Sequence, residues 1–157
     1  MLLAGCKQNT NMSTLNLTQE WDKTFPKSDL VEHSKVTFHN RYGIELAADL
    51  YIPKNAEGRL PAIAVSGPFG AVKEQTSGIY AQHMAERGFL TIAFDPSYTG
   101  ESGGEPRRMA SPDINTEDFL AAVDFLSVQE NVDPERIGII GICGWGGMAI
   151  NAAALDP

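Results

Sequence analysis

The pattern of apolar and polar positions divides the chain into a polar leader, a β-hairpin and a series of alternating strands and helices. Residues 1–30 are mostly polar and show no periodicity. In 44–52, apolar residues occupy every second position, which is typical of a strand with one buried face. The segment 40–43 joins this strand to the run 35–39, and Gly43 can take the positive φ that a tight turn needs. We therefore predict an antiparallel hairpin after a leader of about 30 residues.

Beyond residue 60 the pattern changes to short, continuous apolar runs separated by longer amphipathic stretches. Such runs are typical of strands that are buried on both faces of a parallel sheet. We expect strands at 62–65, 89–94 and 137–140, and helices at 75–87, 116–130 and 144–155. Strands that alternate with helices predict an α/β fold: a mostly parallel sheet with helices on both faces and the hairpin at its edge.

Within the predicted helix 116–130, one stripe carries the apolar side chains. The stripe contains Phe119 and Leu126, whereas Asp118 and Asp124 lie off it. A turn is expected at Asp133–Arg136, before the last strand.

The composition and charge of the chain argue against several kinds of binding partner. The chain has 12 Lys and Arg against 20 Asp and Glu, a net charge of −8, so it offers no broad basic surface for nucleic acid. Arg107–Arg108 is the one tight basic pair, and we interpret it as a solvated loop. The two Cys and three His do not have the spacing of metal-binding motifs, and we predict neither metal nor cofactor.

The N-terminus carries an ambiguous signal. Residues 3–6 read Leu-Ala-Gly-Cys, which resembles the lipobox of bacterial lipoproteins, where the Cys is lipidated after cleavage. A secretion signal has a charged start and a longer apolar stretch than the five residues before Cys6. Two interpretations stay open: a truncated lipoprotein signal with a lipid anchor at Cys6 in the cell envelope, or a chance match in a cytoplasmic protein.

The most informative segment is 141–147, Gly-Ile-Cys-Gly-Trp-Gly-Gly, between a predicted strand and a predicted helix. This is the context of a nucleophile elbow, G-x-Nu-x-G, in which a strained turn pushes the nucleophile into the active site. The helix N-terminus stabilises a thiolate there. Trp145 stands where that pattern has its second Gly. We predict that Cys143 is a nucleophile, with a buried structural thiol as the alternative.

A second loop, 66–70, reads Ser-Gly-Pro-Phe-Gly and follows the first buried strand. In α/β-hydrolases this loop lends a backbone N–H to the oxyanion hole. Pro68 has no N–H, so we predict that Phe69 is the donor and that Gly144 is its partner. An ordinary Gly-Pro turn is the alternative. A third loop, 95–104, is expected to rim the pocket, with polar side chains that mainly hold the loop together.

Segments 66–75, 94–98 and 141–147 together resemble bacterial α/β-hydrolases of the dienelactone-hydrolase-like and S15-peptidase-like group, which are related to fungal polyketide transferases. The resemblance extends from about residue 16 to 157. It implies an eight-stranded sheet, a Cys or Ser nucleophile, and an acid and a His later in the sequence.

That order implies an incomplete triad. Fourteen residues follow Cys143 and none is a His, and Asp156 comes too early to be the acid. His33, His39 and His83 all precede the nucleophile, and we expect none of them to be the base. Residues 31–157 are therefore predicted to be the N-terminal half of an α/β-hydrolase domain that is inactive alone.

The predicted activity is hydrolysis or acyl transfer on the ester, thioester or lactone carbonyl of a small-molecule acyl substrate. Two alternatives stay open. One is a nucleotide-binding module that uses the 141–147 loop, although the G-x-G-x-x-G spacing is not met and no G-x-x-x-x-G-K-[ST] motif occurs. The other is a non-catalytic truncated fragment.

Overall fold

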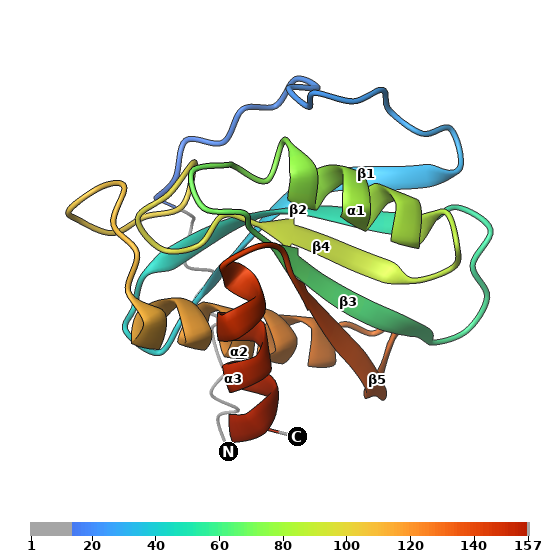
Figure 1. Ribbon diagram of the computed structural model, residues 1–157. Helices are drawn as coiled ribbons and strands as arrows, with labels where there is room; N and C mark the ends of the chain where they lie inside the picture. Colours follow the sequence, from blue (N-terminus) through green and yellow to red (C-terminus); the bar gives the residue numbers. More distant parts are fainter. Residues whose placement is uncertain (1–13, 157) are drawn as a thin grey trace, which may run out of the picture.

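A five-stranded mixed sheet forms the centre of the computed structural model, which describes residues 14–156 (Figure 1). The strand order is β1-β2-β4-β3-β5, with β1–β2 and β2–β4 antiparallel and with β3 parallel to both β4 and β5. The elements are β1 Val31–His39, β2 Glu45–Pro53, β3 Leu60–Ser66, α1 Thr76–Ala85, β4 Leu90–Phe94, α2 Pro112–Ser127, β5 Val132–Gly141 and α3 Trp145–Leu155. The predicted α/β fold, with a leading hairpin and alternating strands and helices, is confirmed.

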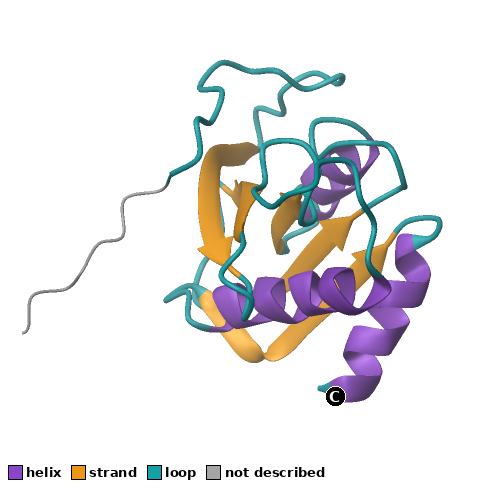
Figure 2. Cartoon of the chain, turned by 90° about the vertical axis from the view of Figure 1, so that its left-hand side faces the viewer, coloured by secondary structure: helices purple, strands orange, loops and turns teal. Residues whose placement is uncertain are grey.

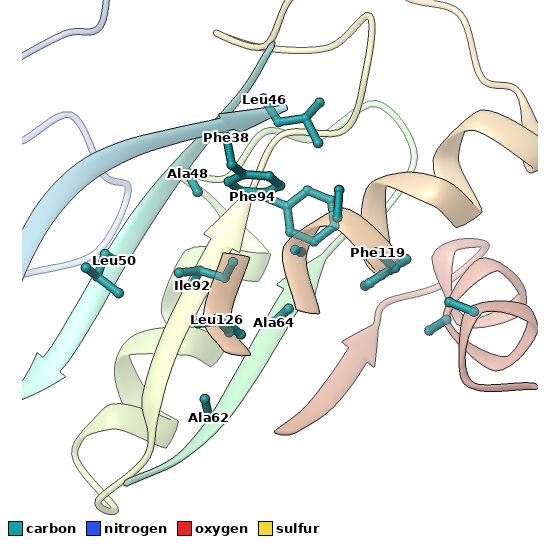
Figure 3. Packing of buried hydrophobic residues seen from close by; sticks show 14 of the residues in the cluster. Phe38, Leu46, Ala48, Leu50, Ala62, Ala64, Ile92, Phe94, Phe119 and Leu126 are labelled. Atoms are coloured by element: carbon teal, nitrogen blue, oxygen red, sulfur yellow. The ribbon is translucent and has the colours of Figure 1, made fainter. Parts of the chain in front are cut away.

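The helices cover both faces of the sheet, as the continuous apolar strands predict. Helix α1 lies on one face, and α2 and α3 lie together on the other (Figures 1 and 2). The larger core is on the α2 and α3 side. There Phe94 of β4 packs edge-on against Phe119 of α2, with ring centroids 5.2 Å apart, and Phe38 of β1 lies beside it (Figure 3).

The prediction that β2 has one buried face is wrong. Glu45, Asp49 and Tyr51, which alternate with its apolar residues, are also buried. The chain segment before β1 covers this second face, where Lys23 Nζ lies 2.8 Å from Asp49 Oδ1 and Thr14 donates to the Glu45 carboxylate. Polar residues of a strand can be buried when charged partners come from elsewhere in the chain, and period-two patterning does not reveal that.

Helix α2 begins at Pro112, four residues before its predicted start, because proline suits the first helical turn. Asp118, which lies off the apolar stripe of this helix, is nevertheless fully buried. Helix α1 ends as predicted near Gly88, which has φ +98° and donates its N–H to the carbonyl of Ala85.

Strand β5 is less buried than its apolar sequence predicts, since Ile137, Ile139 and Ile140 are only half-buried. Within residues 14–156 this strand pairs with β3 alone and forms an edge of the sheet. The predicted turn at Asp133–Arg136 lies within β5 as an irregularity, where the register shifts between its pairings with Leu60 and Ala62.

The segment 14–30 runs alongside β1 and α1 and joins them by polar contacts (Figure 1). Thr24 donates its N–H to the carbonyl of Glu74, and Ser28 to the side chain of Gln82. Cys6 lies outside the described residues, so the lipid anchor stays a prediction. None of the helices in the described part of the chain is long and apolar enough to cross a bilayer.

Candidate active site

The turn between β5 and α3 holds Cys143 in a strained conformation. Its φ is +59°, in the left-handed region that costs a non-glycine residue roughly 1–2 kcal/mol. The turn is fixed from both sides, because Ile142 donates its N–H to the carbonyl of Ser66 on β3 and Trp145 donates to the carbonyl of Ile142. Cys143 is exposed. The strand–turn–helix geometry expected of a nucleophile elbow is therefore present.

Trp145, which replaces the second Gly of the elbow pattern, is accommodated by two other glycines. Its side chain is buried, and a Cβ at Gly67 would overlap the indole ring. A Cβ at Gly141 would overlap the backbone of Trp145. The small residues needed for close packing thus lie at the end of β5 and in the β3–α1 loop, and the indole fills the space between them.

The two predicted oxyanion donors lie next to each other. A Cβ at Gly144 would overlap the ring of Phe69, so the elbow and the β3–α1 loop are in contact. The Phe69 ring also packs on Trp145, with centroids 5.3 Å apart. In the described part of the chain, neither the Phe69 N–H nor the Gly144 N–H donates to a protein acceptor. Both remain available to a ligand.

Lys73 and Asp95 join the loop after β3 to the loop after β4. Both side chains are fully buried. The Lys73 N–H donates to Asp95 Oδ1 at 2.8 Å, and its Nζ donates to Oδ2 at 2.9 Å. The Glu101 N–H donates to the same Oδ2 at 2.9 Å. One carboxylate therefore ties the β3–α1 loop to the β4–α2 loop.

Burial and the neighbouring charges shift the pKa values of these side chains in opposite directions. Burial raises the pKa of Asp95 to about 6, against the lowering effect of the Lys73 charge. Burial acts to lower the pKa of Lys73, but the carboxylates of Asp95, Glu74 and Glu101 outweigh it and raise that pKa. Burial acts to raise the pKa of Glu101, but hydrogen bonds from Lys35 and Lys73 lower it to about 2.

Three carboxylates, those of Asp22, Glu74 and Glu101, lie within 4.8 Å of one another, as in a cation site. Lys35 Nζ, however, lies 3.0, 3.5 and 2.6 Å from them, respectively. Lys73 Nζ also contacts Glu74 and Glu101. Ammonium groups already supply the positive charge, so the cluster is an ion-pair network that ties the segment before β1 to the loops.

A second buried carboxylate, Asp118 of α2, holds the start of the β4–α2 loop at Ser97. Its Oδ1 accepts hydrogen bonds from Asn40 at 2.8 Å and from the Ser97 hydroxyl at 2.7 Å, and its Oδ2 accepts from the Ser97 N–H and from Asn115. Burial nonetheless raises the pKa of Asp118. These contacts agree with the prediction that polar side chains of the 95–104 loop mainly hold that loop in place.

A cavity of about 560 Å³ lies between the two loops. Residues 68–72 form one wall, residues drawn from 96–110 form the other, and Trp145 also lines it. The three loops that follow β3, β4 and β5 gather at one edge of the sheet (Figure 1). This edge is where ligands bind in open α/β sheets.

The three histidines are engaged elsewhere or lie apart from the elbow. His33 Nε2 lies 2.8 Å from Asp49 Oδ1 between β1 and β2, His83 pairs with Glu86 on α1, and His39 ends β1. No hydrogen bond joins any of them to Cys143 in residues 14–156. Lys73 could not be identified from the sequence, where its one signal is its place in a polar stretch after the Gly-Pro-Phe-Gly loop.

The chain is similar to a known protein family and to a relative whose structure has been solved. A family model described as X-Pro dipeptidyl-peptidase (S15 family) matches residues 42–157. An uncharacterized protein of Pseudomonas aeruginosa is 69% identical over 168 residues, which cover 99% of this chain and 45% of that protein. Its crystal structure superposes with a TM-score of 0.90 at 76% identity, over 93% of this chain and 46% of the other.

Two fungal proteins are more distant relatives. A thiohydrolase of Aspergillus aculeatus is 37% identical over 124 residues, or 79% of this chain and 38% of that protein. The crystal structure of an α/β-hydrolase from Penicillium superposes with a TM-score of 0.73 at 29% identity, over 80% of this chain and 42% of the other. The chain thus spans less than half the length of the relatives it matches.

Proposed function

We propose that this chain, which belongs to the X-Pro dipeptidyl-peptidase (S15) family and has the α/β-hydrolase fold, carries the nucleophile of an acyl hydrolase or acyl transferase. In this proposal Cys143 attacks the carbonyl of an ester, thioester or lactone. The names of the relatives, which include thiohydrolase and acyltransferase, support acyl chemistry of this kind.

The observation that carries the proposal is the position of Cys143. An exposed thiol stands at a strained strand-to-helix turn, at the N-terminus of α3 and next to the Gly144 N–H, which donates to no acceptor within residues 14–156. A thiolate is a strong nucleophile, and the partial positive charge of a helix N-terminus stabilises it. A thiol kept only for packing would be buried.

The proposed reaction has two steps. The Cys143 thiolate forms an S–C bond with the carbonyl carbon while the N–H groups of Phe69 and Gly144 donate to the developing oxyanion. The bond to the alcohol or thiol leaving group then breaks, and that group takes a proton. Water or a second acceptor attacks the acyl-enzyme next, and the Cys143 sulfur leaves as a thiolate. The proposal assigns the base to none of the three described histidines.

Nucleotide binding through the 141–147 loop has less support. A phosphate-binding loop needs several free N–H groups. The N–H groups of Trp145, Gly146 and Gly147 donate to carbonyls within the turn, which leaves Gly144 as the free donor among these four. The ring of Phe69 packs against that glycine.

The test is stoichiometric acylation, which needs no turnover. The chain is mixed with p-nitrophenyl valerate, release of p-nitrophenolate is followed by absorbance, and the adduct is located by mass spectrometry. We expect one valeryl group per chain, on Cys143, in the wild type and in the matched control Cys6→Ala. Cys143→Ala should lose both the adduct and the release. Acylation that survives Cys143→Ala, or that falls on Cys6, would refute the proposal.

A further inference from the structure

The cavity beside the elbow has a charge opposite to that of the protein. The chain has a net charge of −8, yet among the described residues the lining includes Arg107 and Arg108 and no Asp or Glu. A second cavity, of about 500 Å³ near α2 and α3, has the composition that an acidic chain leads one to expect. Its lining includes four carboxylates, those of Asp113, Glu117, Asp124 and Asp156, and one Arg. The cationic lining is therefore particular to the first cavity.

Arg107 is held in place without being neutralised. Its guanidinium donates to the backbone carbonyls of Gly100, Ser102 and Gly104, which closes the loop around it. Carbonyl oxygens orient a guanidinium but do not cancel its charge. No ion pair to a carboxylate forms at Arg107 within residues 14–156.

The backbone of Arg108 is held by a hydrogen bond, whereas its side chain has no polar partner among the described residues. Its φ is +60°, and its N–H donates at 2.8 Å to the carbonyl of Tyr98, whose buried side chain lines the same cavity. Its guanidinium makes neither a hydrogen bond nor an ion pair with any residue that the structure describes. A guanidinium at a cavity edge with no carboxylate partner is suited to bidentate binding of a carboxylate or a phosphate.

The rest of the cavity is mostly apolar. Phe69, Val72, Met109 and Trp145 contribute large apolar side chains, and Phe69 and Trp145 pack on each other next to the elbow. A ligand that fills the cavity would thus place an apolar part near Phe69 and Trp145 and a charged part near the two arginines.

We propose that the cavity takes an acyl substrate carrying an anionic group away from the reacting carbonyl, and that Arg108, with Arg107 beside it, binds that anion. This inference rests on the proposed function, since it places the reacting carbonyl at Cys143. The anion is either a carboxylate at the far end of the acyl chain or a phosphate on the leaving group of a thioester.

The experiment compares matched neutral and anionic acyl donors by the rate at which Cys143 is acylated, followed by mass spectrometry of the whole chain. The first pair is p-nitrophenyl valerate and mono-p-nitrophenyl glutarate, which differ by a carboxylate on the acyl chain. The second pair is the valeryl thioesters of N-acetylcysteamine and of coenzyme A, which differ by the phosphates of the leaving group. In one of the two pairs we expect the anionic donor to acylate Cys143 about fivefold faster than the neutral donor. A single ion pair at a partly exposed site stabilises binding by about the corresponding free energy.

The variants Arg108→Gln, Arg108→Lys and Arg87→Gln identify the residue responsible. Arg87 is exposed just after α1, and the one hydrogen bond of its side chain within residues 14–156 is to the sulfur of Met84, so Arg87→Gln removes the same charge outside the cavity. The anionic-to-neutral rate ratio should fall toward 1 in Arg108→Gln, be partly kept in Arg108→Lys and be unchanged in Arg87→Gln. Added NaCl at about 0.5 M should lower the wild-type ratio, because salt screens exposed charges.

The two pairs separate the two sources of the anion. A preference in the first pair assigns a carboxylate on the acyl chain, and one in the second assigns a phosphate on the leaving group. If Cys143 is acylated equally fast by both members of each pair, the anion subsite is wrong while the proposed function stands. If no donor acylates Cys143, the proposed function fails and the subsite fails with it. An equal loss of preference in Arg87→Gln would show a general charge effect and overturn the assignment to Arg108.

Discussion

The Lys73–Asp95 pair joins the two loops at the candidate active site, and its removal should destabilise the fold. Lys73→Met keeps the length and apolar stem of the side chain and removes only the ammonium. Asp95 then loses its cation but keeps two backbone N–H donors, from residue 73 itself and from Glu101. Glu101 keeps Lys35 as a partner at 2.6 Å. The uncompensated charge is therefore that of one fully buried carboxylate.

Breaking a buried ion pair from one side typically costs about 3–5 kcal/mol. Because two backbone donors remain on Asp95, we expect Lys73→Met to lower the free energy of unfolding by about 3 kcal/mol. For a chain of this length such a loss lowers the melting temperature by roughly 10 °C. Urea unfolding followed by circular dichroism measures it.

Two variants make the test specific to the pair. Lys54→Met removes an exposed ammonium and should cost less than about 0.5 kcal/mol. The double variant Lys73→Met/Asp95→Asn has lost both buried charges. Asp95→Asn should therefore lower the free energy of unfolding clearly less in the Lys73→Met background than in the wild type. A Lys73→Met loss below about 1 kcal/mol, or strict additivity in the double variant, would refute this account of the network.

Three further predictions concern the core, the elbow and acid stability. Phe119→Ala should lower the free energy of unfolding by about 3–5 kcal/mol in urea titration, because it leaves a cavity beside Phe94 in the larger core. Gly67→Ala should disturb the near-ultraviolet dichroism of Trp145 and slow acylation of Cys143, because its Cβ would overlap the indole ring at a residue with φ +99°; unchanged spectra and rates would contradict the packing. The pKa of Glu101 is lowered to about 2 from an ordinary 4.5, so its stabilising contribution is complete above pH 4.5 and is lost as the pH falls toward 2. The pKa of Asp95 is raised to about 6, so Asp95 adds stability as the pH falls from 6 to 4. Urea titrations from pH 7 to 3 should therefore show a steep loss of the free energy of unfolding below pH 4.5 and not near pH 6.

The sequence was sufficient for the order and type of the elements because local patterns determine them. Continuous apolar runs identified β3 and β4, and a strand meeting a glycine-rich helix start identified the turn that holds Cys143 at φ +59°. The proposed nucleophile and the two proposed oxyanion donors depend on short-range geometry of this kind, so all three could be proposed from the chain alone.

The buried charges could not be predicted, because their partners are far apart in sequence. The alternating pattern of its strand places Asp49 on the solvent face, but in the structure Asp49 is buried and pairs with Lys23. Asp118 reads as the solvent side of a helix, yet it accepts a hydrogen bond from Asn40, 78 residues earlier. The arginine pair was interpreted as a solvated loop because nothing in the sequence places Arg108 beside the cavity.

Whether the fold activates Cys143 can be decided by a single labelling experiment. The chain is treated with limiting iodoacetamide in buffer and again in urea, and the alkylation rates of Cys143 and Cys6 are read from their peptides in the same samples. We expect Cys143 to react faster than Cys6 in the folded chain and to lose that advantage in urea, because the proposed activation needs the turn and the helix N-terminus, which exist only in the folded state. Equal rates for the two cysteines in buffer, or a Cys143 rate that rises on unfolding, would contradict the claim.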